Sequence, residues 1–328
     1  MVRRHEIGLE KIKGIRIGQA ENTDAGTGCT VFLSDHGMAE GLDVRGGGPA
    51  SRESELLNPL AAAQVIHGIV LAGGSAFGLN AAGGVMQYLE ERGIGFDVGL
   101  PIKVPLVCQS DLFDLTVGDP CVRPDKEMGY AACVNSENGG NYRNGNYGAG
   151  CGATVGKFAG MGYCMKSGIG SCAVQIGELQ IAAVVAVNAL GDIFDWKTGD
   201  KIAGLLAEDG RSFRDTSELM CADTRAVDNK FTGNTTIGVV ITNAAFDKTR
   251  LCKIAGMAHD GYARSIRPVH TSADGDSIYA VSVGNVSADM DLTGMMAAEV
   301  MSEAITRAVK SAKSAYGFPA AEDLKKQV

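Results

Sequence analysis

Two adjacent threonines, Thr235 and Thr236, stand at the head of an apolar run in the stretch GNTTIGVVITN, residues 233–243. The second half of this stretch is β-branched and largely apolar, which predicts a buried strand. Gly-Asn before a strand is ordinary turn chemistry, and Asn234-Thr235-Thr236 matches the N-glycosylation pattern. The other interpretation is chemical: a threonine hydroxyl becomes a nucleophile when a base lies beside it. Thr235 would gain such a base, its own amine, if the peptide bond before it were broken.

Two glycine-rich stretches are similar to known site motifs but depart from them. GAGCGATVGK, residues 148–157, has Cys151 where a phosphate-binding loop needs glycine, and Phe158 follows its lysine in place of Ser or Thr. It fits a looser dinucleotide fingerprint, but it follows a polar loop where that motif needs a strand. LAGGSAFG, residues 71–78, lacks the glycine that a nucleophile elbow requires two places after Ser75. Nucleotide binding is therefore not predicted, and Ser75 is expected to cap a helix.

The five histidines show no spacing typical of a metal site or of a histidine-based nucleophile. His259 and His270 are the pair nearest in sequence, and each is expected to be a structural or surface residue. A free α-amine, with an ordinary pKa of about 7.7–8.0, is the remaining base that works at neutral pH. This leads back to Thr235. Nothing in the sequence calls for a metal or an organic cofactor.

Composition excludes several other classes of protein. The chain has 328 residues, a net charge of −8 and no block of basic residues, which argues against binding to nucleic acid or to an anionic membrane. The longest apolar run, residues 181–187, is too short for a membrane span, and the N-terminus does not read as a signal peptide. Nine cysteines without a CxxC pair favour reduced thiols in a cytoplasmic protein.

The elements that would position these residues follow a mixed order of strands and helices. Apolar patterns predict strands at 14–18, 28–34, 67–74 and 277–284, a hairpin over 171–189 that turns at Gly177-Glu178, and helices near 79–89, 201–208, 251–262 and 296–308. The third of these helices must end before Pro268. No regular strand–helix alternation is present, so the expected fold is a layered α/β sandwich and not a doubly wound sheet.

Several blocks of the sequence together resemble one known family. They are residues 14–33, 43–57, 67–96, 148–157, 233–246 and 255–284. These blocks are similar to the self-cleaving aminopeptidase–amidase family, which contains the L-aminopeptidase/D-esterases, the β-aminopeptidases and the nylon-oligomer hydrolases. The resemblance extends over roughly residues 8–318, almost the whole chain.

The resemblance implies an N-terminal-nucleophile-type hydrolase with an α-β-β-α sandwich, formed by residues 1–328 as one domain. The precursor would cut itself between Asn234 and Thr235 into an α piece, residues 1–234, and a β piece, residues 235–328. Thr235 would then be the nucleophile. The resemblance also implies a homo-oligomer, commonly a tetramer of αβ units, that acts on small peptides or amides.

Four further site residues are carried over from the family by position. Lys157 matches the catalytic lysine, and Asn188 matches an asparagine that donates to the oxyanion of the tetrahedral intermediate. Asp274 and Asp276 match the paired carboxylates of the nylon-oligomer hydrolases. Each has a simpler alternative: a solvated surface lysine, a turn asparagine at a strand end, and a hairpin turn formed by Asp-Gly-Asp.

The expected function is therefore hydrolysis of amide bonds through an acyl-threonine intermediate, with release of N-terminal residues and with esters as side substrates. Three alternatives remain open at this point. The chain could cleave 6-aminohexanoate oligomers internally, it could pass the acyl group to an amine as ornithine acetyltransferases do, or it could be an unprocessed binding protein.

Overall fold

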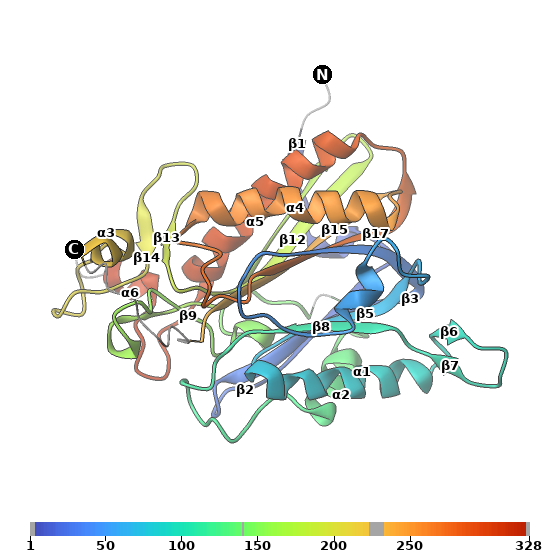
Figure 1. The fold of residues 1–328 in the computed structure, drawn as a ribbon, viewed down its shortest axis with the longest axis horizontal. Helices are drawn as coiled ribbons and strands as arrows, with labels where there is room; N and C mark the ends of the chain where they lie inside the picture. Colours follow the sequence, from blue (N-terminus) through green and yellow to red (C-terminus); the bar gives the residue numbers. More distant parts are fainter. Residues whose placement is uncertain (1–3, 140, 223–232, 326–328) are drawn as a thin grey trace.

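Two large β-sheets share one long strand and form the centre of the molecule (Figure 1). The computed structural model describes residues 4–139, 141–222 and 233–325. The first sheet contains β1 (Arg4–Glu6), β11 (Ile169–Ile176), β12 (Leu179–Asn188), β15 (Thr235–Ala244), β17 (Ser277–Val286) and the second half of β3 (Thr27–Val44). The second sheet contains β2 (Arg16–Asn22), the first half of β3, β5 (Ile66–Ala72), β8 (Val107–Asp111) and β4 (Ala50–Arg52).

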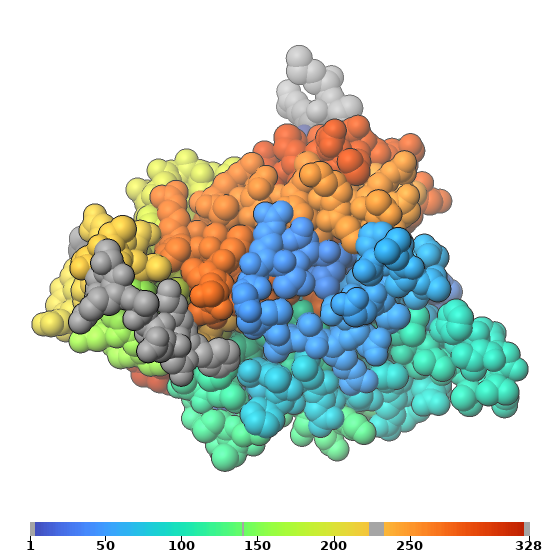
Figure 2. Space-filling view, viewed as in Figure 1, coloured from blue at the N-terminus to red at the C-terminus, as the bar shows by residue number. Residues whose placement is uncertain are grey.

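Helices cover the outer face of each sheet. Helices α4 (Lys248–Ser265) and α5 (Met290–Ser311) pack on the first sheet, and α1 (Ala81–Glu90) and α2 (Lys126–Asn135) pack on the second. Figure 2 shows α4 and α5 in orange and red along one side of the molecule and α1 in cyan along the opposite side. This arrangement confirms the predicted α-β-β-α sandwich.

The alternation of side chains along β15 shows why its sequence is a continuous apolar run. Val240 packs in the core under α4 and α5, whereas Val239 and Ile241 pack in the core between the two sheets. A strand that is buried on both faces has no polar side, so apolar residues occupy successive positions. Each fully buried Val or Ile stabilises the fold by about 1.5–3 kcal/mol. The head of this strand is therefore fixed rigidly.

The remaining elements are short and lie around these layers. They are α3 (Thr216–Ala222), α6 (Ala321–Lys325), β6 (Phe96–Asp97), β7 (Lys103–Val104), β9 (Thr154–Val155), β10 (Met165–Lys166), β13 (Asp192–Phe194), β14 (Lys201–Ala203), β16 (Ile266–Arg267) and the 3-10 turns η1 (Leu9–Lys11), η2 (Ser54–Leu57), η3 (Ser75–Asn80), η4 (Gly148–Gly150) and η5 (Met161–Tyr163).

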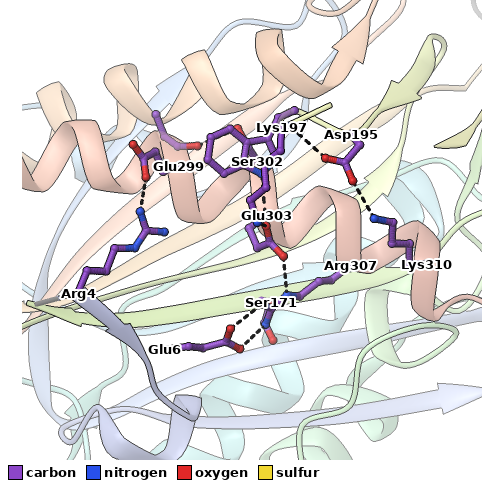
Figure 3. Close-up of polar contacts among 12 residues, drawn as sticks. Arg4, Glu6, Ser171, Asp195, Lys197, Glu299, Ser302, Glu303, Arg307 and Lys310 are labelled. Carbon is purple, nitrogen blue, oxygen red and sulfur yellow. Dashed lines mark hydrogen bonds and ion pairs between the residues drawn. The ribbon is translucent and has the colours of Figure 1, made fainter. Parts of the chain in front are cut away.

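Ion pairs fasten the edge strand β1 to helix α5 (Figure 3). Arg307 donates to both carboxylate oxygens of Glu6, at 2.7 and 2.8 Å, and to Glu303 at 3.2 Å. Arg4 pairs with Glu299, which lies one helical turn before Glu303 on α5. Because these side chains are partly exposed, each pair contributes little stability, about 0–1 kcal/mol. Their main effect is to hold the edge of the first sheet against its covering helix.

Two local predictions are wrong, each for a definite reason. Residues 201–208 were predicted as a helix, but 201–203 form β14, paired with β13. Gly204 follows with φ +148°, which no helix permits, and Asp192 accepts a hydrogen bond from the backbone N–H of Leu205 at 2.7 Å. Ser75 is not a helix cap, because Gly74 occupies the capping position and Ser75 is the first residue of η3.

Other local predictions are confirmed. The hairpin of β11 and β12 turns at Gly177 and Glu178, and α4 ends at Ser265, before Pro268. Among the residues that the structure describes, none of the helices combines the length and apolar character needed to span a bilayer.

Candidate active site

Thr235 is the first residue of β15 and lies directly opposite Asn188, the last residue of β12. The two strands run antiparallel, so the start of one meets the end of the other at the same edge of the sheet. Both residues are buried; Thr235 is 3% exposed and Asn188 is fully buried. Strand register alone therefore brings together two of the residues predicted for the site.

The side chain of Asn188 is held by five hydrogen bonds. Its Oδ1 accepts from Lys157 Nζ at 2.8 Å, and from the backbone N–H and the hydroxyl of Thr154 at 3.0 and 3.4 Å. Its Nδ2 donates to the carbonyl oxygen of Phe113 at 2.9 Å and to that of Gly233 at 3.2 Å. The amide is thus fixed in orientation, with one N–H aimed at the chain just before Thr235. Asn188 is not a plain turn residue.

Lys157 reaches the same point from the loop after β9. Backbone hydrogen bonds from Gly156 and Lys157 to the carbonyls of Gly191 and Leu190 pin that loop beside the end of β12. The Lys157 Nζ donates to the Asn188 carbonyl at 3.1 Å, to Asn188 Oδ1 at 2.8 Å and to the Gly233 carbonyl at 2.9 Å. With 2% exposure it is not a surface lysine. Burial lowers the pKa of Lys157 to about 7.

The peptide bond predicted to be cut lies within this cluster. The Thr235 hydroxyl donates a hydrogen bond to the carbonyl oxygen of Asn234, the residue on the other side of that bond. Gly233, one residue earlier, adopts φ +69°, a conformation that favours glycine. Asn234 is only 2% exposed, so the glycosylation interpretation of this stretch does not fit the folded chain.

Asp274 and Asp276 lie in the segment that enters β17, the parallel neighbour of β15. Asp276 Oδ1 accepts from the backbone N–H of Thr236 at 2.8 Å, which ties this carboxylate to the residue after Thr235. Asp274 Oδ2 accepts from the backbone N–H and hydroxyl of Thr271, at 2.9 and 2.5 Å. Burial, and then the charge of Asp276, raise the pKa of Asp274 to about 6.

The segment from Asp274 to Asp276 is not the hairpin turn that the alternative interpretation offered, because β17 pairs with β15 and β3. It packs instead against the glycines that follow β3. The backbone N–H of Gly46 donates to the Asp276 carbonyl at 3.2 Å, and that of Gly48 donates to the Asp274 carbonyl at 2.8 Å. A Cβ on Gly275 would lie 2.7 Å from Thr235 Oγ1. Glycine here lets the acidic segment approach the hydroxyl closely.

Sequence reasoning missed two residues of this cluster. His270, expected to be structural or on the surface, lies with its Nδ1 2.8 Å from Asp276 Oδ2, and its backbone N–H donates to the same oxygen at 3.1 Å. Phe113 follows β8 of the second sheet, and its ring lies against Gly233. No motif marks Phe113. The only available signal for His270 was its position six residues before Asp276.

These groups together suit attack on a carbonyl carbon. A hydroxyl, a buried amine with a pKa near 7, an amide donor and two carboxylates surround one short stretch of backbone. In the described ranges, no three His, Cys, Asp or Glu side chains are grouped so that they could hold a metal ion. The structure brings together all five residues predicted for catalysis, and their catalytic roles stay predictions.

The first variant that tests these roles is Asn188→Ala. If the amide donates to the developing oxyanion, turnover should fall on the order of 10²–10³-fold. Stability should fall too, because Thr154 N–H and the Phe113 carbonyl lose a buried partner, at about 1–3 kcal/mol each. Asn243→Ala is the matched control, since Asn243 links the same two strands at their other ends, through Gln180 N–H at 2.7 Å and the Glu178 carbonyl at 2.9 Å. Equal losses of turnover in both variants would return Asn188 to a structural role.

The acidic pair should show itself in the pH profile of hydrolysis. Because the pKa of Asp274 is raised to about 6, its carboxylate loses its charge as the pH falls through that value. Turnover of the wild type should therefore fall more steeply below about pH 6 than protonation of the Thr235 amine alone would give. Asp274→Asn should lower turnover at neutral pH and lose this extra steepness. Asp276→Asn should reduce turnover more than it lowers the melting temperature, since one carboxylate oxygen holds the N–H of Thr236 and the other holds His270 beside the site. A loss of melting temperature without loss of turnover would mark either residue as structural.

Comparison with known proteins places this geometry in context. The model of peptidase family S58 matches residues 9–322 of the chain. An uncharacterized aminopeptidase of Mycobacterium leprae is 36% identical, with 95% of this chain and 92% of that protein covered. The 6-aminohexanoate-oligomer endohydrolase of Kocuria sp. is 30% identical, with 90% of this chain and 84% of that protein covered.

A solved structure shares the fold at much lower sequence identity. It is the L-aminopeptidase D-Ala-esterase/amidase of Ochrobactrum anthropi, described as a variant of the Ntn hydrolase fold. The two structures align with a TM-score of 0.68 at 16% identity, over 93% of this chain and 86% of that one.

Proposed function

Because the chain belongs to peptidase family S58 and is accordingly an amide-bond hydrolase, we propose that Thr235 is its nucleophile and that the chain exposes Thr235 by cutting its own Asn234–Thr235 bond. The observation that carries this proposal is the convergence on residues 233–235. The Thr235 hydroxyl is bonded to the Asn234 carbonyl, and both Lys157 and Asn188 donate to the carbonyl just before it.

In self-cleavage the Thr235 hydroxyl oxygen bonds to the carbonyl carbon of Asn234 and the carbon–nitrogen bond breaks. The hydroxyl proton passes to the nitrogen, which becomes the free amine of Thr235. The product is an ester between Asn234 and the Thr235 side chain. Water then adds to the ester, which leaves a carboxylic acid on Asn234 and restores the hydroxyl.

The freed amine gives Thr235 the base that it lacked. When the hydroxyl oxygen attacks a substrate carbonyl, the amine takes the hydroxyl proton and passes it to the leaving amine of the substrate. Water hydrolyses the resulting acyl-threonine. Departure of Gly233 releases the N–H groups of Lys157 and Asn188, which then stabilise the negative oxygen of each tetrahedral intermediate. Asp274 and Asp276 hold the start of β15 in reacting geometry.

The test is intact-mass measurement of the purified wild type together with a substrate panel. Two fragments are expected, residues 1–234 and residues 235–328, and the second should begin with Thr-Thr-Ile-Gly. Aminoacyl p-nitroanilides should be hydrolysed by the two-fragment form. A wild type that stays one chain yet hydrolyses amides would place the nucleophile elsewhere. Ser75, whose backbone N–H donates to the carbonyl of Leu112 next to Phe113, would then be examined first.

Cleavage of 6-aminohexanoate oligomers is the second candidate function. It is favoured by the relative of that name, which is 30% identical to this chain. Incubation of the processed protein with a linear and a cyclic oligomer separates the two candidates, because a cyclic oligomer has no amino end and only an endohydrolase opens it. Transfer of the acyl group to ornithine in place of water would reveal acyltransferase activity in the same assay.

The setting of the protein is part of the proposal. All nine cysteines lie within the described residues and are free thiols, which supports action in the reducing cytoplasm. We also expect a homo-oligomer of αβ units, and native mass measurement decides its size.

A further inference from the structure

We infer that Phe113 is a specificity-determining residue for the acyl side of the substrate. The first acyl residue carries the carbonyl that is attacked, and Phe113 excludes any side chain on the second residue, which precedes it. The inference rests on the proposed role of Thr235 and deepens it. Acceptable substrates are then a single free aminoacyl residue, a residue preceded by glycine, or an unbranched chain. Peptides with any other residue at the second position would be excluded.

The acyl side of the site can be mapped because the chain is its own first substrate. The ester formed in self-cleavage joins the Asn234 carbonyl carbon to Thr235 Oγ1. The acyl-enzyme formed from an external amide joins the substrate carbonyl carbon to the same oxygen. Asn234 therefore occupies the place of the first acyl residue, and Gly233 occupies the place of the second.

The second position is closed on one side by the ring of Phe113. A Cβ added to Gly233 would lie 2.1, 2.5 and 2.6 Å from the ring atoms Cδ1, Cγ and Cε1, which are its three nearest neighbours. Carbon atoms that are not bonded need about 3.5–4.0 Å. A methyl group at this position overlaps the ring in the observed geometry, so either the ring or the substrate must move.

Gly233 cannot easily move away from the ring, because its carbonyl is fixed. Lys157 Nζ donates to that oxygen at 2.9 Å and Asn188 Nδ2 donates at 3.2 Å. In the uncut chain these two bonds set the depth of Gly233 against Phe113, and an external substrate must place its second residue in the same space. The two hydrogen bonds that position Gly233 therefore also keep it against the Phe113 ring, which excludes a side chain there.

The ring cannot easily move either, because the backbone on both sides of it is anchored. The carbonyl of Phe113 accepts from Asn188 Nδ2 at 2.9 Å, and the neighbouring Leu112 N–H donates to the Ala72 carbonyl at 2.8 Å. On the other side the Asp114 carboxylate accepts from Gly74 N–H at 2.7 Å and from the Thr27 hydroxyl at 2.7 Å. Relief would require the Phe113 side chain to leave its rotamer.

The two candidate functions are both compatible with this constraint. An aminopeptidase substrate has no residue at the second position. A 6-aminohexanoate oligomer has an unbranched chain throughout. A general endopeptidase, which must accept varied residues at the second position, is not compatible with it.

Self-cleavage supplies the first test and needs no knowledge of the external substrate. Gly233→Ala is made in the wild type and in Phe113→Ala, and the amount of intact chain is followed by mass after synthesis. Alanine at φ +69° is strained in both backgrounds, so that effect cancels in the comparison. Gly233→Ala should slow cutting at least about tenfold with Phe113 present and clearly less with Phe113→Ala. An equal slowing in both backgrounds would overturn the inference.

Hydrolysis supplies the second test. Gly-Asn and Ala-Asn p-nitroanilides differ only by the methyl group at the second position. The processed wild type should favour the glycyl substrate by at least about tenfold in kcat/KM, and Phe113→Ala should reduce that preference. Phe96→Ala, a change in an exposed phenylalanine that is 55% accessible, is the control and should keep the preference.

The outcomes separate the inference from the proposed function. A wild type that neither cuts itself nor hydrolyses amides overturns both. A wild type that cuts itself and hydrolyses both dipeptide substrates equally well overturns the inference alone.

Discussion

Thr235→Val and Thr235→Ala should each yield one intact and inactive chain of 328 residues, where the wild type yields pieces of 234 and 94 residues. Valine keeps the shape of threonine and removes only the hydroxyl, so the strand should remain folded. Without that oxygen no ester can form at Asn234. Loss of a hydrolase nucleophile lowers turnover on the order of 10⁶-fold, which leaves no measurable activity in an ordinary assay. Mass measurement and hydrolysis of an aminoacyl p-nitroanilide check the two halves of this prediction.

Thr236→Val is the matched control. Within the described part of the chain, the hydroxyl of Thr236 is buried and makes no hydrogen bond. Its removal should leave both self-cleavage and hydrolysis close to wild type. Thr235→Ser keeps a hydroxyl and should still cut. If Thr235→Val is cleaved at the same bond, or if Thr236→Val is not, the nucleophile has been assigned to the wrong residue.

Lys157→Met should give the second largest loss. The Lys157 ammonium is surrounded by three acceptors, two of them on Asn188 and one on Gly233. Methionine fills a similar volume but donates no hydrogen bond. The Gly233 carbonyl therefore loses its charged donor, and the Asn188 side chain loses a partner that orients it. We expect hydrolysis to fall on the order of 10³-fold, and self-cleavage to slow because the Gly233 carbonyl is no longer held beside the bond that is cut. Near-normal rates would mean that the charge of Lys157 is not used.

The same variant tests the pKa of Lys157 independently of catalysis. The folded chain holds this group at a pKa of about 7, and an unfolded chain holds lysine near its ordinary 10.5. Between these values the unfolded chain binds more protons at Lys157, so this group contributes a rise of the free energy of unfolding with pH, of up to about 1.4 kcal/mol per pH unit.

Lys166 also has its pKa lowered to about 7 by burial and should contribute a similar rise. The buried thiols whose pKa is raised by burial contribute a slope of the opposite sign, but they and Lys166 are present in both chains. Lys157→Met should therefore lower the slope, relative to the chain that keeps Lys157, by up to about 1.4 kcal/mol per pH unit. Urea unfolding of both chains at pH 7, 8 and 9 measures this, in a Thr235→Ala background that stays uncut. An unchanged slope would contradict the lowered pKa of Lys157.

Much of the fold could be predicted because its patterns are local. β15 is buried on both faces and reads as an unbroken apolar run, and the hairpin of β11 and β12 carries its turn residues Gly177 and Glu178 in sequence. The apolar spacing of residues 201–208 suits a helix, but Lys201 and the backbone N–H of Leu205 bind the Asp192 carboxylate instead. Asp192 lies outside this segment, so the spacing within the segment does not reveal these contacts. Tertiary contacts of this kind leave no periodic trace in the sequence.

The candidate site likewise has features that the sequence predicts and features that depend on tertiary contacts. By itself, the sequence determined that Thr235 begins a core strand, and its resemblance to a family marked Lys157, Asn188, Asp274 and Asp276. Only the tertiary structure decided what these residues touch. Strand register sets Asn188 against Thr235, and the parallel entry of β17 brings Gly275 beside the hydroxyl.

The second sheet contributes Phe113 from 120 residues before Gly233, and nothing in the sequence near either residue signals that contact. Motifs record which side chains are present along the chain, whereas contacts across sheets depend on how the layers pack. For that reason the nucleophile could be recognised from sequence, and the shape of the pocket that receives the acyl group could not.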